Sequence, residues 1–353
     1  MDRLMRPWRG WMTVALGVVL ASVSGGCGTR AGVIFPPVEN APRWPAEPQP
    51  ARISYVGQLV SSADLKPGRS FFQVLGDALL GKKEVRSMLS PVAVCTDGGQ
   101  RVFVADSNAQ VVHVFDLDSR RYEQWRPAEP QKFSQPVGLA WDAAGKRLLV
   151  ADSMAETVFV FDESGRFSGS LGKGMLRRPC GVLVDGARGR VLVSDVLVHQ
   201  VVVLSSRGEL LARLGKRGTA PGEFNYPTYL AMDRAGRLYV SDSLNFRVQQ
   251  FSADLKPLRQ IGQQGDMPGQ FSHPKGMAVD SEDHLYVVDA HFEAVQIFDA
   301  EGRLLLNFGR EGRGPGEFWL PNGIFIDGRD RLWTADVYNR RLQVFDYHRE
   351  AKP

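Results

Sequence analysis

Residues 227–251, PTYLAMDRAGRLYVSDSLNFRVQQF, alternate between short apolar runs and turn-forming residues. Residues 230–232, 238–241 and 248–251 have the residue types of β-strands. The Asp, Gly, Ser and Asn residues between them favour turns, because they tolerate turn dihedrals or hydrogen-bond to the local backbone. A fourth strand-like run follows at residues 258–261. The stretch therefore predicts one sheet of four antiparallel strands.

Near copies of this stretch recur along most of the chain. An Asp ends the second strand of each copy, at intervals of 43 to 47 residues, at Asp106, Asp152, Asp195, Asp242, Asp289 and Asp336. A Pro opens each first strand, at Pro91, Pro136, Pro179, Pro227, Pro274 and Pro321. Nine residues after each Asp stands a large apolar residue, namely Phe115, Phe161, Leu204, Phe251, Phe298 or Phe345. A period in the forties with four strands per copy predicts an all-β fold, a six-bladed β-propeller of four-stranded antiparallel blades.

The copies resemble NHL repeats over roughly residues 90–346. The resemblance rests on residues 227–251, on 321–327 with 335–345, and on the linkers 215–224 and 309–318. It implies the propeller fold and hardly constrains activity, because one fold hosts many functions. The first three copies are degenerate: the Asn and Arg of Asn245, Arg247, Asn339 and Arg341 are replaced by Ala109, Val111, Ala155, Thr157, Val198 and Gln200.

The sixth copy lacks a fourth strand, because the chain ends soon after Phe345. Residues 52–56, RISYV followed by Gly57, have the pattern of the fourth strands elsewhere. We expect this N-terminal strand to complete the last blade and close the ring, so that no long strand edge is exposed. The propeller then spans residues 51–348.

Residues 1–27 have the features of an export signal. Arg3, Arg6 and Arg9 form a basic start, and residues 11–23 form an apolar run too short for a comfortable membrane span. Small residues and Cys27 follow, which resembles a bacterial lipoprotein processing site with lipidation at Cys27, although Ser24 stands where the pattern prefers Leu. An ordinary secretory signal with an incidental Cys is the alternative.

Residues 28–50 are rich in Pro and predict a semi-extended tether. Gly28 follows the Cys in place of Asp, and by resemblance to Gram-negative lipoproteins this favours the outer membrane, facing the periplasm. Residues 58–89 form an enlarged linker in which residues 71–80 predict a short amphipathic helix. We expect this insertion near the channel mouth, either as stabilising packing on the rim or as a lid or docking element.

The candidate ligand site is the face on which the Pro and Asp positions lie. The residue after each opening Pro is expected to point to the channel, and the loops after each Asp add further side chains. Blades 4 to 6 give this face a polar side, consisting of Thr228, Tyr229, Asn245, Lys275, His291, Asn322 and Tyr338. Lys275 with Tyr229 or Asn322 would suit a small anionic group, or Lys275 would only satisfy channel carbonyls.

Metal and enzyme chemistry have weaker support. The NHL-like amidating lyase has metal-binding His residues directly after the blade Pro, and none of these six positions is His here. His199 and His291 could still meet across the mouth. The repeated Asp residues are interpreted as scaffold that accepts hydrogen bonds in each turn. Cys95 and Cys180 are expected to be free thiols. We expect no catalytic residue, no resident metal and no cofactor.

The composition, with 43% hydrophobic and 23% charged residues and a formal net charge of +4, fits a globular domain and gives no indication of a nucleic-acid surface. We therefore expect an exported, monomeric binding or scaffold propeller, anchored to the cell envelope through the Cys27 lipid. Its partner would be a protein, peptide or glycan. The alternative is a metal-dependent hydrolase or lyase with a site at the channel mouth.

Overall fold

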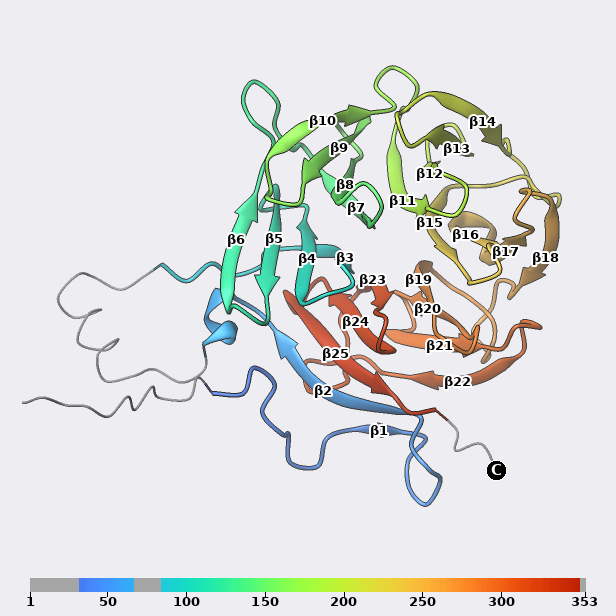
Figure 1. Ribbon diagram of the computed structural model, residues 1–353. Coiled ribbons are helices and arrows are strands. Elements are labelled where there is room, and N and C mark those ends of the chain that lie inside the picture. Colours follow the sequence, from blue (N-terminus) through green and yellow to red (C-terminus); the bar gives the residue numbers. More distant parts are fainter. Residues whose placement is uncertain (1–31, 67–83, 350–353) are drawn as a thin grey trace, which may run out of the picture.

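The computed structural model describes residues 32–66 and 84–349, which form a ring of six antiparallel sheets (Figure 1). Blade 1 contains β3 (Pro91–Thr96), β4 (Arg101–Asp106), β5 (Val111–Asp116) and β6 (Arg121–Trp125). Blade 2 contains β7 (Pro136–Asp142), β8 (Arg147–Asp152), β9 (Thr157–Asp162) and β10 (Phe167–Leu171). Blade 3 contains β11 (Pro179–Asp185), β12 (Arg190–Asp195), β13 (Gln200–Ser205) and β14 (Leu210–Leu214).

The second half of the ring repeats this arrangement. Blade 4 contains β15 (Pro227–Met232), β16 (Leu238–Asp242), β17 (Arg247–Phe251) and β18 (Pro257–Ile261). Blade 5 contains β19 (Pro274–Val279), β20 (Leu285–Asp289), β21 (Ala294–Phe298) and β22 (Leu304–Phe308). Blade 6 contains β23 (Pro321–Ile326), β24 (Arg331–Asp336), β25 (Arg341–Tyr347), β2 (Ile53–Leu59) and β1 (Arg43–Trp44). The predicted fold class is confirmed.

The first strand of each blade lies next to the first strands of the two neighbouring blades, so these six strands surround the central channel. In every blade the opening Pro is paired with the strand-ending Asp, as in Pro227 with Asp242. All these Pro and Asp residues therefore lie on one face of the ring, which we call the Pro–Asp face.

The core lies between adjacent sheets. The apolar residue nine positions after each Asp is almost fully buried there, as Phe251 and Phe298 illustrate. Burying one such side chain contributes roughly 1.5–3 kcal/mol. In blades 4 to 6 a second Phe from the linker, such as Phe224 or Phe271, is also fully buried beside it. These aromatic pairs pack in clusters that include residues of the preceding blade.

The ring is closed by the N-terminal strand, as predicted. β2 pairs with β25 in the registers Ile53 with Tyr347 and Leu59 with Leu342. The strand is longer than expected and continues to Leu59, which is fully buried. The first two strands and the last three strands of the described chain thus lie in one sheet (Figure 1).

The N-terminal segment before β2 also packs against the propeller from residue 32 onward, although the sequence predicted a tether over residues 28–50. β1 adds a fifth strand to blade 6, and the ring of Trp44 lies 5.4 Å from that of Phe308. Phe35 packs edge-on against Trp333, and Arg120 donates a hydrogen bond to the carbonyl oxygen of Gly32. These apolar and aromatic side chains within a Pro-rich segment provide the contacts.

The described N-terminal end of the 58–89 insertion begins in β2 of blade 6 and continues to the outer strands of blade 1. The short 3₁₀ helix η1 (Ser62–Leu65) contacts β5 and β6, and Arg120 donates to the carbonyl oxygen of Leu65. Leu65 and Met88 are buried between blades 1 and 6. Both ends are packed against the propeller. The helix expected at residues 71–80, the export signal and Cys27 lie outside the described residues.

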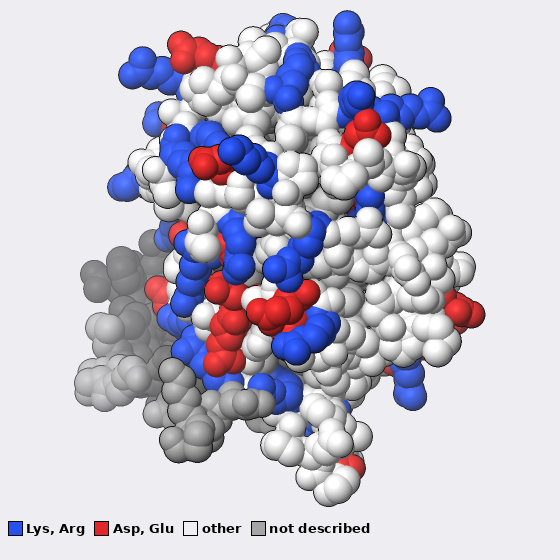
Figure 2. Space-filling model, turned by 90° about the vertical axis from the view of Figure 1, so that its right-hand side faces the viewer, with Lys and Arg blue, Asp and Glu red and all other residues white. Residues whose placement is uncertain are grey.

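Charged side chains of both signs are interspersed on the side where β14, β18 and β22 form the outer edge, and much of this side carries no charge (Figure 2). Among the described residues, no helix has the length and hydropathy needed for a membrane span.

Candidate functional site

The repeated Asp residues hold the Pro–Asp face together, as predicted. In blade 1 the carboxylate of Asp106 accepts hydrogen bonds from the backbone N–H groups of Leu89 and Ser90, which precede the first strand, and from Ala109 in its own turn. Asp152 does the same in blade 2. The hydrogen bonds within the turn were predicted from the sequence, whereas the hydrogen bonds to the preceding linker were not.

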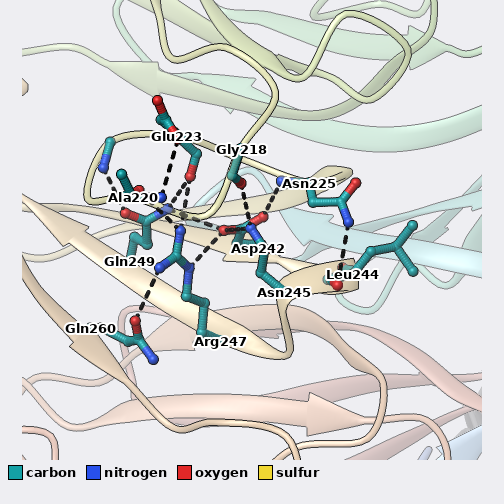
Figure 3. A network of polar contacts seen from close by, with 12 residues as sticks. Gly218, Ala220, Glu223, Asn225, Asp242, Leu244, Asn245, Arg247, Gln249 and Gln260 are labelled. Atoms are coloured by element: carbon teal, nitrogen blue, oxygen red, sulfur yellow. Dashed lines mark hydrogen bonds and ion pairs between the residues drawn. The ribbon is translucent and has the colours of Figure 1, made fainter.

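Blades 4 and 6 contain a more extensive network around this Asp, and Figure 3 shows the one in blade 4. In blade 4, Oδ2 of Asp242 accepts hydrogen bonds from Arg247 Nε at 2.8 Å, from Asn245 and from Gln249. Arg247 also donates to the carbonyl oxygens of Ala220 and Glu223 in the linker. Asp336, Asn339, Arg341 and Gln343 repeat the pattern in blade 6. The network connects each linker loop to its blade by hydrogen bonds. The side-chain amide of Asn245 therefore makes structural hydrogen bonds, to Asp242 and to the carbonyl oxygen of Gly218.

In the two blades with this network, the residue before the opening Pro has a left-handed backbone conformation. Tyr226 and Leu320, which precede Pro227 and Pro321, have positive φ values of 68° and 50°. Their N–H groups are bonded by side chains of the preceding blade: Tyr226 donates to Nδ1 of His199, and Leu320 donates to Oε2 of Glu293. His199 and Glu293 thus connect adjacent blades.

A pocket of about 330 Å³ lies at the junction of blades 5 and 6 on the Pro–Asp face. Four of the seven predicted site residues line it: Lys275, His291, Asn322 and Tyr338. His273 adds a second imidazole, whose ring centroid lies 6.3 Å from that of His291. No Asp or Glu is among the described residues that line the pocket, so its wall holds no carboxylate for the Lys275 ammonium. The pocket therefore presents one positive charge, one amide and two imidazoles in a partly apolar wall.

The other three predicted residues lie elsewhere. Thr228 is buried, with its hydroxyl 2.6 Å from that of Ser243. Tyr229 reaches into the channel, where its hydroxyl donates to Oδ1 of Asn322 at 2.7 Å. Asn245 belongs to the scaffold network described above. Only Tyr229 among the three is connected to the pocket, through Asn322.

An aromatic stack stands at the edge of the pocket. The exposed ring of Tyr338 lies 5.4 Å from that of Trp319, and the guanidinium of Arg313 lies 4.7 Å from the Trp319 ring centroid. Cation–π and ring contacts of this kind hold the side chains in place. Trp319 and Arg313 were not among the predicted residues, because the blade landmarks do not mark linker residues.

The second residue after each Asp forms a ring of side chains on the same face. In four blades this residue is apolar and exposed: Met154 (63%), Leu197 (56%), Leu244 (43%) and Tyr338 (57%). Asn108 and His291 complete the set in blades 1 and 5. Of the four apolar residues only Tyr338 was predicted from the sequence as a site residue, although the fixed distance from the Asp would have found the other three.

Metal ligands do not converge in the part of the chain that the structure describes, where no group of three or more His, Cys, Asp or Glu could hold a metal ion. His199 is engaged by Tyr226, and His291 lies beside His273. Cys95 is buried and Cys180 partly buried, and both are free thiols, as expected. Burial raises the pKa of Cys180 to about 11, although nearby Lys275 and Arg178 oppose the shift.

Two family descriptions match parts of the chain. Residues 224–251 match the NHL repeat, and residues 280–350 match a family described as 6-bladed beta-propeller. Among curated proteins no significant relative is found.

Solved structures with a similar fold have diverse functions. An auxiliary nutrient binding protein from Bacteroides ovatus aligns with a TM-score of 0.59 and 13% identity over 74% of this chain and 70% of that chain. Virginiamycin B lyase from Staphylococcus aureus aligns with a TM-score of 0.54 and 13% identity over 74% of this chain and 96% of that chain. At these identities the likeness concerns the fold alone. The repeat matches and the ring of six sheets identify the chain as a six-bladed β-propeller that contains NHL repeat sequence.

Proposed function

We propose that this protein is a non-catalytic binding propeller of the bacterial cell envelope that engages an acidic peptide segment of a partner protein through its Pro–Asp face. The observation that carries the proposal is the pocket between blades 5 and 6, in which Lys275 has no carboxylate partner among the described residues. A carboxylate entering this pocket would gain a charge-assisted hydrogen bond from the ammonium group. Asn322 and the two imidazoles offer further hydrogen bonds.

The exposed apolar side chains on the Pro–Asp face favour a peptide over a glycan as the ligand. Met154, Leu197 and Leu244 expose aliphatic side chains at equivalent positions of three blades on the Pro–Asp face, where they can contact apolar residues of a bound peptide. The stack of Tyr338, Trp319 and Arg313 adds the residue types that dominate binding energy at interfaces. No observation on the described residues favours the metal-dependent alternative.

The test uses residues 28–353 on an array of acidic peptides, their neutral Gln and Asn analogues, and neutral and uronic-acid glycans. We expect peptides with a carboxylate beside apolar residues to bind. Lys275→Gln should weaken binding by roughly 10- to 100-fold, the equivalent of a lost hydrogen bond to a charged group. Lys173→Gln, at an exposed position in the linker before blade 3, is the matched control and should bind as the wild type does.

Binding that is equal for acidic and neutral peptides, or equal for wild type and Lys275→Gln, would contradict the proposal. Selective binding of glycans would replace the peptide by a carbohydrate partner.

Attachment to the envelope through Cys27 is part of the proposal and is tested separately. Expressed with its own N-terminus in a Gram-negative host, the protein should fractionate with the outer membrane, and mass spectrometry should show an acylated N-terminal Cys. Cys27→Ser should release the protein from the membrane fraction. A wild-type protein found unacylated in the soluble periplasmic fraction would refute lipid anchoring.

A further inference from the structure

A second cavity, of about 280 Å³, occupies the central channel. On the side of the Pro–Asp face it begins two residues after the opening Pro in five of the blades, at positions such as Gly138 and Gly323, and at Met277 in blade 5. At the other end it reaches the last residues of the first strands, including Trp141 and Met232. None of the described residues that line it is charged at neutral pH. The cavity thus differs in chemistry from the pocket between blades 5 and 6.

Tyr229 lines the cavity at its end toward the Pro–Asp face. Its position holds Gly in four other blades and Ala93 in blade 1, so only blade 4 has a large side chain there. The Tyr229 hydroxyl donates to Oδ1 of Asn322 and lies 3.2 Å from the carbonyl oxygen of Val92. Because blades 4 and 1 are opposite in the ring, the phenol crosses the channel. Burial raises the pKa of Tyr229 well above its usual value, so the hydroxyl keeps its proton and remains a donor.

The glycines of the other blades cannot take over this role. A Cβ on Gly276 would lie 2.5 Å from the carbonyl oxygen of Asn322, and one on Gly181 would lie 2.5 Å from that of Thr228. The close approach of neighbouring blades therefore requires Gly at these positions. The channel is left wide enough for a cavity below the Tyr229 side chain.

The wall of the cavity combines apolar side chains with backbone polar groups. The first strand of each blade is an edge strand of its sheet, and it pairs on one side only, with the second strand of the blade. Its other edge faces the channel, so some N–H and C=O groups there are available for hydrogen bonds. Trp141, Phe325 and the two thioethers of Met232 and Met277 supply surfaces that suit an aromatic ring.

We propose that this channel cavity binds one uncharged, two-ring aromatic compound, independently of the peptide site on the Pro–Asp face. An apolar cavity of roughly 150 Å³ in another protein binds benzene, so the channel cavity, nearly twice as large, fits two fused rings. A charged compound is disfavoured because the wall provides no counter-charge for a desolvated ion. A small polar substituent can be satisfied by the backbone groups of the channel.

The test compares naphthalene with 2-naphthoate, a charged compound of similar size, by isothermal titration calorimetry on residues 28–353 carrying Lys275→Gln, which removes the ammonium group that would bind the carboxylate in the other pocket. We expect saturable binding of naphthalene with one site per chain and at least roughly 10-fold weaker binding of 2-naphthoate. Met232→Trp, which fills the cavity, should abolish naphthalene binding. Leu211→Trp, at an exposed position on the rim, should leave it unchanged, and so should restoring Lys275.

A crystal soaked with 2-bromonaphthalene provides a measurement that does not depend on the folding of a variant. The anomalous signal of bromine should lie in the channel beside Trp141. An absence of saturable naphthalene binding, a bromine site only outside the channel, or undiminished binding by a folded Met232→Trp variant would each overturn the proposal. None of these outcomes affects the peptide site, which is tested by Lys275→Gln.

Discussion

The backbone N–H of Tyr226 donates a hydrogen bond of 3.1 Å to Nδ1 of His199, a side chain of the preceding blade. Arg247, Asn245 and Gln249 occupy Oδ2 of Asp242, so this Asp no longer accepts from both N–H groups of the linker as Asp106 does in blade 1. In the same way, Glu293 of blade 5 accepts a hydrogen bond from the backbone N–H of Leu320, which precedes blade 6. Residues four positions after an Asp therefore connect blades where the Arg-containing network is present.

The His199 contact predicts an acid-dependent loss of stability. Burial lowers the pKa of His199 from its usual 6.5, with Arg217 adding to the shift, so the unfolded chain binds this proton more readily than the folded one. The stabilising contribution is complete above about pH 6.5 and is lost as the pH falls through the lower pKa of the folded state.

His199→Gln keeps an acceptor for Tyr226 but cannot be protonated. We expect this variant to lose less stability than the wild type in urea unfolding between pH 7 and pH 5. His199→Leu should cost about 1 kcal/mol at pH 7.5, because the acceptor is removed. Parallel pH profiles of the wild type and His199→Gln would show that this contact does not titrate as described.

Glu293 predicts the opposite dependence on pH. Burial raises the pKa of its carboxyl from 4.5 to about 7, and the neighbouring Asp336, Glu311 and Asp289 act in the same direction, while the hydrogen bond from Leu320 opposes the shift. Between pH 4.5 and 7 the folded chain holds a proton that the unfolded chain releases. The contribution of this carboxyl is therefore full below pH 4.5 and is lost as the pH rises through 7.

Glu293→Gln is permanently neutral and keeps a carbonyl oxygen for Leu320. The variant should be more stable than the wild type at pH 8 and equal to it at pH 4, as measured by denaturant unfolding. Glu301→Gln, at an exposed turn, serves as the control and should change stability at neither pH. A Glu293→Gln variant that is less stable than the wild type at pH 8 would show that the ionised carboxylate does not destabilise the fold at this position.

Arg247 is predicted to be a major stabilising residue of blade 4. Its guanidinium is almost fully buried and pairs with Asp242 at 2.8 Å. Arg247→Met leaves the carboxylate buried without its partner, which should cost about 3–5 kcal/mol of unfolding free energy. Arg166→Met removes an ion pair of similar geometry to Asp162, but that guanidinium is 83% exposed, so the cost should stay below about 1 kcal/mol. Equal costs for the two variants would show that burial of the network does not determine its contribution.

Closure of the ring by β2 predicts a strong effect of a core truncation in that strand. Leu59 is fully buried between blades 6 and 1. Leu59→Ala should lower the unfolding free energy by about 2–5 kcal/mol, because it removes packing and leaves a cavity. Leu211→Ala, on the exposed rim, should stay within about 0.5 kcal/mol of the wild type. A small effect of Leu59→Ala would mean that the N-terminal strand contributes little to closure.

The sequence by itself determined the blades, their number and the closing strand. The alternation that marks each strand and the turn residues between strands act over a few residues, so a repeat of 43 to 47 residues displays them six times. The missing fourth strand after Phe345 then required a replacement, and residues 52–56 had the matching pattern. Their positions relative to the Pro and Asp of each copy also predicted that Lys275, His291, Asn322 and Tyr338 lie on one face.

Only the tertiary structure decided which side chains of different blades meet. Tyr229 lies 137 residues from Val92 and 93 from Asn322 in the sequence, and its contacts with both depend on the diameter of the closed ring. The blade contacts of His199 and Glu293 likewise depend on how adjacent sheets are rotated about the channel. Such distances are set by the packing of whole sheets against one another, for which no short stretch of sequence carries a pattern.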